Sequence, residues 1–491
     1  MSNLEDKAAD IKSDAALERA SIEHDGTIFE ERELDQDRFS VWSVVGIQYS
    51  CSAAPLAICS FTYLVAGVGG SSYFTWCYLV AVVGQLLVAA SLAEISAILP
   101  HASGQVFWAG SLGPPKLARF ASYFVGALTF FGWTLGVAGT CVFTGEYIAA
   151  FANLVVPTYL AKSYHVFLIS TANAVLAIVI NVLAVKLLHG LNKTMIVLFN
   201  AAAFYIFVVL LVKAQPKVSA YDALVKVVNE TGWSSNGFVE EIPQPQRNVP
   251  IVMFFTACLN AITGFVMVIA LAFCTVAPEN LMEPLAGVPI LQIAKDTWDN
   301  HGWVITVAII MLLVPLNGAI AITTGGSRLL WAFAKCGGIL GGRRLGNTNV
   351  KLQVPANAVC ATAILALLLS LLLFGPTTVL NGIFGSLGIC MAVSYFLPIL
   401  FMLLTDRKTF DERRHFNLGK WGRLINIAAL VWLVVTVVSL SLPLYSPVTM
   451  GNMNWAGVVF LGLVVLLMGN WVAVKDSYTI PKPLCLAVSR G

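Results

Sequence analysis

Charged residues are scarce in this chain. Asp, Glu, Lys and Arg make up only 11% of its 491 residues, whereas soluble domains carry about 25%. Hydrophobic residues make up 58%. This balance excludes an ordinary soluble domain and predicts an integral membrane protein. The formal net charge is only +3 and the basic residues lie in separate loops, so we expect the lipid bilayer and no nucleic acid as a partner.

Motifs for catalysis and metal binding are also missing. The ten cysteines form no CxxC pair and no cluster with histidine, which excludes the common metal-ligand spacings. No arrangement of a nucleophile with a base is evident. The first 38 residues lack the apolar core of a cleaved signal peptide, so residues 1–38 are predicted to be a disordered cytoplasmic tail. The sequence therefore predicts no enzyme, no metal site and no cofactor.

Long apolar runs are abundant. A helix that crosses a bilayer needs about 20 apolar residues. Eleven runs reach this length, at residues 42–66, 73–99, 119–152, 165–187, 191–213, 249–276, 302–330, 354–374, 378–404, 422–442 and 453–472. The predicted fold class is all-α, a polytopic membrane protein with 11 transmembrane helices.

The basic residues between the runs predict which side of the membrane each loop faces, since Lys and Arg concentrate on the cytoplasmic side. Lys116 and Arg119 follow the second run, which places the N-terminus inside, and the basic tail of residues 473–491 is also placed inside. Five crossings from the N-terminus put Lys213 outside. Six crossings toward the C-terminus require the residues before Pro250 to be inside.

The linker of residues 213–248 therefore has to cross the membrane, yet its charges interrupt every window long enough to do so. One helix is predicted to be missing from it. The alternative is that the charge rule fails here, or that one long run is bent or re-entrant and changes the count.

Several stretches carry a resemblance to a known family. The segment from Ser91 to Trp108 (SLAEISAILPHASGQVFW) resembles the signature after the second helix of the amino acid/polyamine/organocation permeases. Residues 46–58, 114–123, 240–253 and 327–338 match the same group, and the similarity is greatest to the fungal amino acid, choline and GABA permeases. The resemblance covers the chain from about residue 39 to the C-terminal region.

This resemblance implies a leucine-transporter-like fold of twelve helices, in which the first ten form two inverted repeats. It implies a membrane domain over residues 39–472, with the first repeat over 39–213 and the remainder over 249–472. The run that starts at Glu240 normally follows the sixth helix directly, so the missing helix is expected to be the sixth. A faulty gene model, a splice form and a real deletion all remain open.

Helices one and six carry much of the substrate site in such transporters, where a broken helix exposes backbone polar groups at mid-membrane. Small residues and a proline in the first run favour such a break, although an ordinary kinked helix is the alternative. The predicted substrate-binding residues are Gly46, Ser50, Cys51, Ser52, Ala53, Trp133 and Asn317.

Two carboxylates lie within the predicted helices, Glu94 and Glu146. An intramembrane carboxylate is a functional candidate, but both lie near a helix end, where snorkelling to water or structural hydrogen bonding is favoured. Glu94 is a predicted gating residue together with Arg328, whose motif from Ser327 to Gly338 has Lys335 and Cys336 where relatives commonly have Arg and Asp.

The predicted function is a permease of the plasma membrane or an internal, vacuolar, membrane. It is expected to move an amino acid or a related small nitrogenous solute, such as choline, GABA or a polyamine, by alternating access. The resemblance implies proton coupling. Without the sixth helix we expect the chain to be transport-deficient. The alternative is a membrane sensor or a truncated regulatory isoform of a permease that does not transport.

Overall fold

A computed structural model describes residues 53–60, 62, 68–99, 101, 103–226, 228–229, 250–281, 283–349, 354–374, 378–405, 416–443, 448–449 and 453–481. The predicted tail of residues 1–38 lies outside this part of the chain, as do Gly46, Ser50, Cys51 and Ser52. The structural statements that follow concern the described residues.

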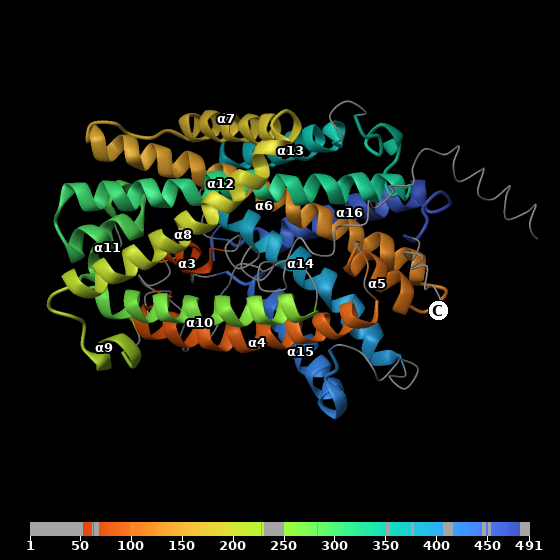
Figure 1. Cartoon of the computed structure of the whole chain (residues 1–491), viewed down its shortest axis with the longest axis horizontal. Helices are drawn as coiled ribbons and strands as arrows, with labels where there is room; N and C mark the ends of the chain where they lie inside the picture. Colours follow the sequence, from red (N-terminus) through yellow and green to blue (C-terminus); the bar gives the residue numbers. More distant parts are fainter. Residues whose placement is uncertain are drawn as a thin grey trace, which may run out of the picture. The chain divides into compact units, whose positions relative to one another are not determined.

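The described chain is almost entirely helical (Figure 1). Ten of its helices are long and apolar enough to cross a membrane, and they coincide with ten of the eleven predicted runs. The first run is represented by the short helix α3. The helices are α3 (Ala54–Ser60), α4 (Gly70–Ile98), α5 (Gln105–Leu112), α6 (Ala118–Val155), α7 (Ser163–Val182), α8 (Val185–Lys213), α9 (Ala220–Leu224), α10 (Pro250–Cys274), α11 (Pro289–Thr297), α12 (His301–Lys335), α13 (Ala356–Ser370), α14 (Thr378–Leu404), α15 (Gly422–Ser439) and α16 (Ala456–Val474).

Short turns and strands complete the described elements. Five 3-10 helices lie in the connections: η2 (Pro278–Leu281), η3 (Leu285–Gly287), η4 (Gly342–Arg344), η5 (Leu371–Phe374) and η7 (Gly419–Trp421). The two strands, β1 (Val68–Gly69) and β2 (Val228–Asn229), have two residues each and pair antiparallel. One predicted boundary was wrong: the run 165–187 was predicted as one helix, but α7 ends at Val182 and α8 begins at Val185.

The longest helices, α6 and α12, pack against each other, and α7, α13 and α14 pack around α6. Their contacts use small residues, because a close approach of two backbones replaces the hydrophobic driving force that lipid does not provide. A buried amide strengthens the contact of α7 with α12. Asn181 Nδ2 donates to the Ile320 carbonyl over 3.1 Å, and the Thr324 hydroxyl donates to Asn181 Oδ1 over 2.6 Å.

Helices α4 and α10 lie side by side and antiparallel (Figure 1). The Tyr78 hydroxyl of α4 contacts the carbonyls of Asn260 and Ala261 in α10, at 3.2 and 3.1 Å. Near the start of α10, the ring of Phe254 packs 5.9 Å from Phe416. The backbone N–H of Leu418, two residues further, donates to Glu94 Oε1 near the end of α4. The start of α10 therefore lies beside the end of α4. We call this the α5 end of the bundle.

The other end of α10 meets the end of α8. Cys274 Sγ donates to the Leu210 carbonyl over 3.3 Å, and Val218 N donates to the Phe273 carbonyl over 3.1 Å. Both helices thus finish at the same end of the bundle, which we call the α9 end. Two successive crossings should finish at opposite ends, so the chain between Asn229 and Pro250 joins the α9 end to the α5 end. The structure has the same mismatch in direction as the charges in the sequence.

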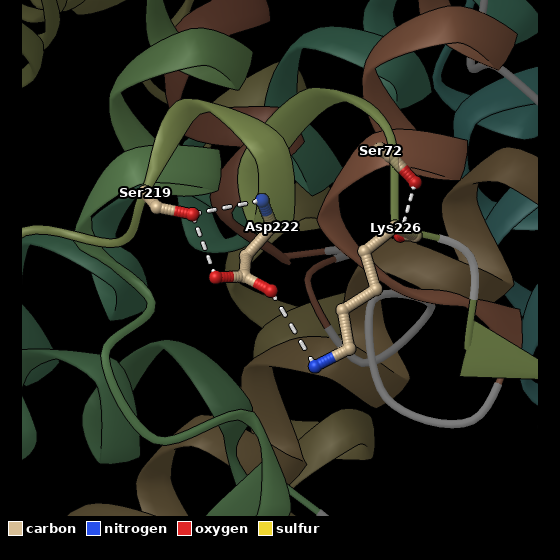
Figure 2. Close-up of polar contacts among 4 residues, drawn as sticks. All are labelled: Ser72, Ser219, Asp222 and Lys226. Carbon is tan, nitrogen blue, oxygen red and sulfur yellow. Dashed lines mark hydrogen bonds and ion pairs between the residues drawn. The ribbon is translucent and has the colours of Figure 1, made fainter.

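A strap of residues 218–229 closes the α9 end. The Ser72 hydroxyl at the start of α4 donates to the Lys226 carbonyl over 2.5 Å (Figure 2). Within the strap, the Ser219 hydroxyl accepts from Asp222 N and donates to Asp222 Oδ2, while Lys226 lies 3.4 Å from Asp222 Oδ1. The Ser219 hydrogen bond and the nearby lysine lower the pKa of Asp222. The carboxylate is therefore ionised at neutral pH and holds the turn that reaches α4.

Candidate functional site

The described part of the first membrane run begins at Ala53, which is not helical. This residue has a φ of 43°, in the left-handed region, and α3 begins at the next residue. The N–H groups of Leu56 and Ala57 donate to the Ala53 carbonyl at 2.9 and 3.0 Å, so Ala53 caps the start of α3. A right-handed helix cannot continue through this dihedral angle. The end of a helix at a buried residue leaves polar backbone groups inside the bundle.

Helix α3 is anchored in the interior by aliphatic packing and one hydrogen bond. Leu56 and Cys59 are fully buried in a cluster that includes Met267 of α10 and Met311 of α12. The Tyr147 hydroxyl of α6 donates to the Ser60 hydroxyl over 3.2 Å. The interrupted helix is therefore held by α6, α10 and α12, far from the surface that lipid would cover.

The other two predicted site residues that the structure describes lie on α6 and α12. Trp133 of α6 is half-buried and rests on Gly325 and Gly326 of α12, where an added Cβ would lie 3.0 and 3.2 Å from its side chain. Asn317 is 8% exposed, and its Oδ1 atom has no hydrogen-bond partner among the described residues. A buried amide oxygen without a donor costs free energy and can accept from an ammonium or hydroxyl group of a solute.

The predicted gating residues do not meet. Glu94 is completely buried, and its carboxylate accepts the Leu418 N–H over 3.3 Å, so of the two expected alternatives it makes a structural hydrogen bond and does not snorkel to water. Arg328 is exposed on α12 and makes no ion pair with Glu94. The buried position suits Glu94 because α15 and the turn before it cover this part of α4. A gating role for either residue stays a prediction.

Glu146 lies near the α9 end of α6, directly before Tyr147. It is half-buried, and its carboxylate makes no ion pair within the described ranges. Such a group costs free energy in an apolar environment unless a cation or water meets it. Together with the Tyr147–Ser60 contact, it makes the region beside α3 polar on its α6 side.

Sequence reasoning missed three polar contacts. The Tyr147–Ser60 bond joins residues 87 positions apart, and no local pattern predicts it. The Asn181 bridge had a weak signal, since an asparagine inside an apolar run commonly bonds a neighbouring helix. Asn173 of α7 similarly donates to the Thr144 hydroxyl of α6 over 2.8 Å.

An interrupted helix held inside a bundle of membrane-length helices defines a class of protein, the polytopic transporters with discontinuous helices. The comparisons with known proteins name the family. The amino acid permease family matches residues 39–465. The chain belongs to this family and is a membrane transporter.

The chain is similar to several fungal transporters. It is 26% identical to a choline transporter of Saccharomyces cerevisiae, over 88% of this chain and 80% of the relative. It is 27% identical to a protein of Macrophomina phaseolina named as an amino acid/polyamine transporter, over 80% of this chain and 92% of the relative. A polyamine transporter of Saccharomyces cerevisiae is 23% identical, over 89% of this chain and 75% of the relative.

The aligned stretches are longer than the part of this chain that they cover. The choline transporter aligns over 458 residues, but 88% of 491 residues is about 432, so about 26 positions have no counterpart here. For the Macrophomina phaseolina protein, 421 aligned residues stand against 80% of the chain, or about 393, which leaves about 28. Each difference is at least as long as one transmembrane helix of about 20 residues.

Proposed function

We propose that this chain derives from a permease for a small organic cation, such as choline or a polyamine, and that it lacks one crossing of the complete transporter. The position of α3 carries this proposal, because this short helix starts at the non-helical Ala53 and lies among α6, α10 and α12, as the discontinuous helices of such transporters do. Proton coupling is expected from the family resemblance.

A cationic solute is favoured over a neutral one by three groups on α6 and α12. Glu146 supplies a carboxylate without an ion pair among the described residues, and Asn317 supplies an amide oxygen. Trp133 supplies an aromatic surface of the kind that binds quaternary ammonium groups. The printed names of two relatives, a choline transporter and a polyamine transporter, agree with this chemistry.

The missing crossing is supported by two observations. The helices α8 and α10 both finish at the α9 end, and the relatives have about 26 or more aligned positions that this chain lacks. We place the α5 end in the cytoplasm and the α9 end outside, since Arg119, Arg343 and Lys475 all lie near the α5 end. By the same rule we expect the N-terminus in the cytoplasm, and the family resemblance leads us to expect the plasma membrane or a vacuolar membrane.

The test is uptake of labelled choline, putrescine, GABA and a neutral amino acid by cells that produce one of two forms. One form is the chain as it stands, and the other carries an apolar helix of about 20 residues inserted between Val239 and Glu240. We expect saturable uptake of choline or putrescine only with the restored form. Glu146→Gln should reduce that uptake by about tenfold or more, while Glu279→Gln, at an exposed loop position, should not.

Two results would contradict the proposal. Saturable uptake by the 491-residue form would show that the missing helix is not needed. Uptake of the neutral amino acid alone, unaffected by Glu146→Gln, would refute the cationic substrate. Equal amounts of both forms in the membrane, measured by a C-terminal tag, make the comparison valid.

A further inference from the structure

The chain does not leave the bundle where its last helix ends. Helix α16 ends at Val474, and residues 475–481 turn back onto the α5 end. Tyr478 is 1% exposed, and its hydroxyl lies 2.9 Å from the Ser122 hydroxyl of α6. Its ring meets Tyr123 edge-on, with centroids 5.6 Å apart, and Phe333 of α12 at 5.9 Å. A terminal segment with a fully buried aromatic side chain is a packed element of the fold.

The backbone of the same segment is held from two sides. The Arg119 guanidinium at the start of α6 donates to the carbonyls of Lys475 and Tyr478, the latter over 3.0 Å. The N–H of Thr479 donates to the carbonyl of Cys336, one residue past the end of α12, over 2.9 Å. The start of α6 and the end of α12 are thus joined through these residues.

The close packing of residues 475–481 against the end of α12 depends on a glycine. Gly337 has a φ of 77°, and a Cβ at this position would lie 2.7 Å from the Ser477 carbonyl oxygen. In α16, Asn470 Nδ2 donates to the Tyr123 hydroxyl and to the Gly338 carbonyl, both over 2.8 Å. Hydrogen bonds therefore link α16 and residues 475–481 to both α6 and the end of α12. Burial also raises the pKa of the Tyr478 phenol, so it stays neutral and can hydrogen-bond at physiological pH.

We propose that residues 475–481 form a C-terminal latch that keeps the α5 end of the bundle closed by fastening α6 to α12. The latch is one short segment held by one buried aromatic side chain and a few hydrogen bonds, whereas α6 and α12 share a long helix interface. It can therefore detach without unfolding the bundle. Any opening of the bundle at this end requires its release, and factors that bind the tail beyond it would control that opening.

The test uses Cys336 as a reporter, because its thiol is half-buried, its carbonyl accepts the Thr479 N–H of the latch, and burial raises the pKa of the thiol. A Cys485→Ser background removes the thiol further along the tail. The purified chain is labelled with a maleimide in detergent, and the labelled cysteines are identified by mass spectrometry. Tyr478→Ala should accelerate labelling of Cys336 by about tenfold or more, since loss of a buried aromatic side chain greatly weakens packing. Tyr221→Ala, at a 65% exposed tyrosine of α9, is the matched control and should leave the rate unchanged.

The site of labelling separates a latch from a general loss of structure. Faster labelling at Cys336, with Cys141 and Cys390 still protected inside the bundle, supports the latch. An unchanged rate in Tyr478→Ala would overturn it, and so would equal acceleration at Cys141 and Cys390. If Tyr478→Ala does not fold, Ser122→Ala removes only the hydroxyl partner and should give a smaller acceleration at Cys336, with an unchanged rate overturning the proposal. None of these readouts needs transport, so the latch can fail or hold independently of the proposed substrate.

Discussion

The antiparallel packing of α4 on α10 can be tested at Gly264. A Cβ added at this position would lie 2.0 Å from the Tyr78 hydroxyl oxygen and 2.9 Å from Ile58 Cδ1. Real Cβ atoms do not approach so closely, so Gly264→Ala must displace the Tyr78 ring. The displaced hydroxyl then loses its contacts with the carbonyls of Asn260 and Ala261.

The expected cost has two parts. A lost hydrogen bond of a buried hydroxyl costs about 1 kcal/mol, and overpacking of a close helix contact costs about 1–3 kcal/mol. Alanine also favours the helix over glycine by about 1 kcal/mol, so Gly264→Ala should lower the free energy of unfolding by about 1–3 kcal/mol in total. Gly462→Ala is the matched control, because nothing lies within 4 Å of a Cβ at that position of α16. An alanine there should be neutral or stabilising, since it favours the helix by about 1 kcal/mol.

The assay is the midpoint temperature at which the tagged protein in detergent loses its monodisperse elution peak. Gly264→Ala should lower this midpoint relative to Gly462→Ala. Combining it with Tyr78→Leu should cost less than the sum of the two single changes, because the smaller side chain makes room for the new methyl group. If Gly264→Ala is as stable as Gly462→Ala, α4 and α10 do not pack as described. The antiparallel placement of α10 along α4 would then lose its support.

Two further predictions concern polar contacts away from the first helix. Asn181→Leu should destabilise the protein by about 1–2 kcal/mol, because it removes a bridge between α7 and α12. Thr324→Val removes only one of the hydrogen bonds of Asn181 and should cost less. The same thermal assay measures both variants, and equal stability of Asn181→Leu and wild type would refute the bridge. A lowered pKa means that the ionised Asp222 stabilises the strap above the ordinary aspartate pKa of about 3.9, and that this contribution is lost as the pH falls below it. A spin label at Tyr221→Cys should therefore become more mobile as the pH falls below about 4. In Asp222→Asn the same label should already be more mobile at pH 7. Mobility that does not change with pH would contradict the stabilising role of the Asp222 carboxylate.

The helical architecture could be predicted from the sequence, because apolar runs long enough to cross a membrane are visible in the sequence itself. Ten of the eleven runs correspond to long helices of the described chain, and the residue pattern near Glu94 was sufficient to indicate the permease family. The mismatch in direction between α8 and α10 could also be predicted, since it follows from the alternation of sides. Side-chain contacts could not.

Glu94 shows the reason. Its distance along α4 placed it near a helix end and left both snorkelling and structural hydrogen bonding open, but it did not indicate that the turn containing Leu418 would supply the hydrogen bond. That turn is 324 positions further along the chain, and no local pattern describes it. The anchor at Tyr478 was missed in the same way, because a basic tail with no apolar run gives no sign that one tyrosine is buried.

The backbone conformation of Ala53 has a consequence for substitutions at this position. Ala53 keeps its methyl group in a backbone conformation that costs about 1–2 kcal/mol for any residue with a Cβ and nothing for glycine. Replacement of Ala53 by glycine would remove this strain. It would also increase the conformational freedom of the unfolded chain and of the folded backbone at this position. An alanine strained at this position resists rotation of its backbone more than a glycine would, so α3 is expected to start at a stiff, defined point and not at a freely rotating one.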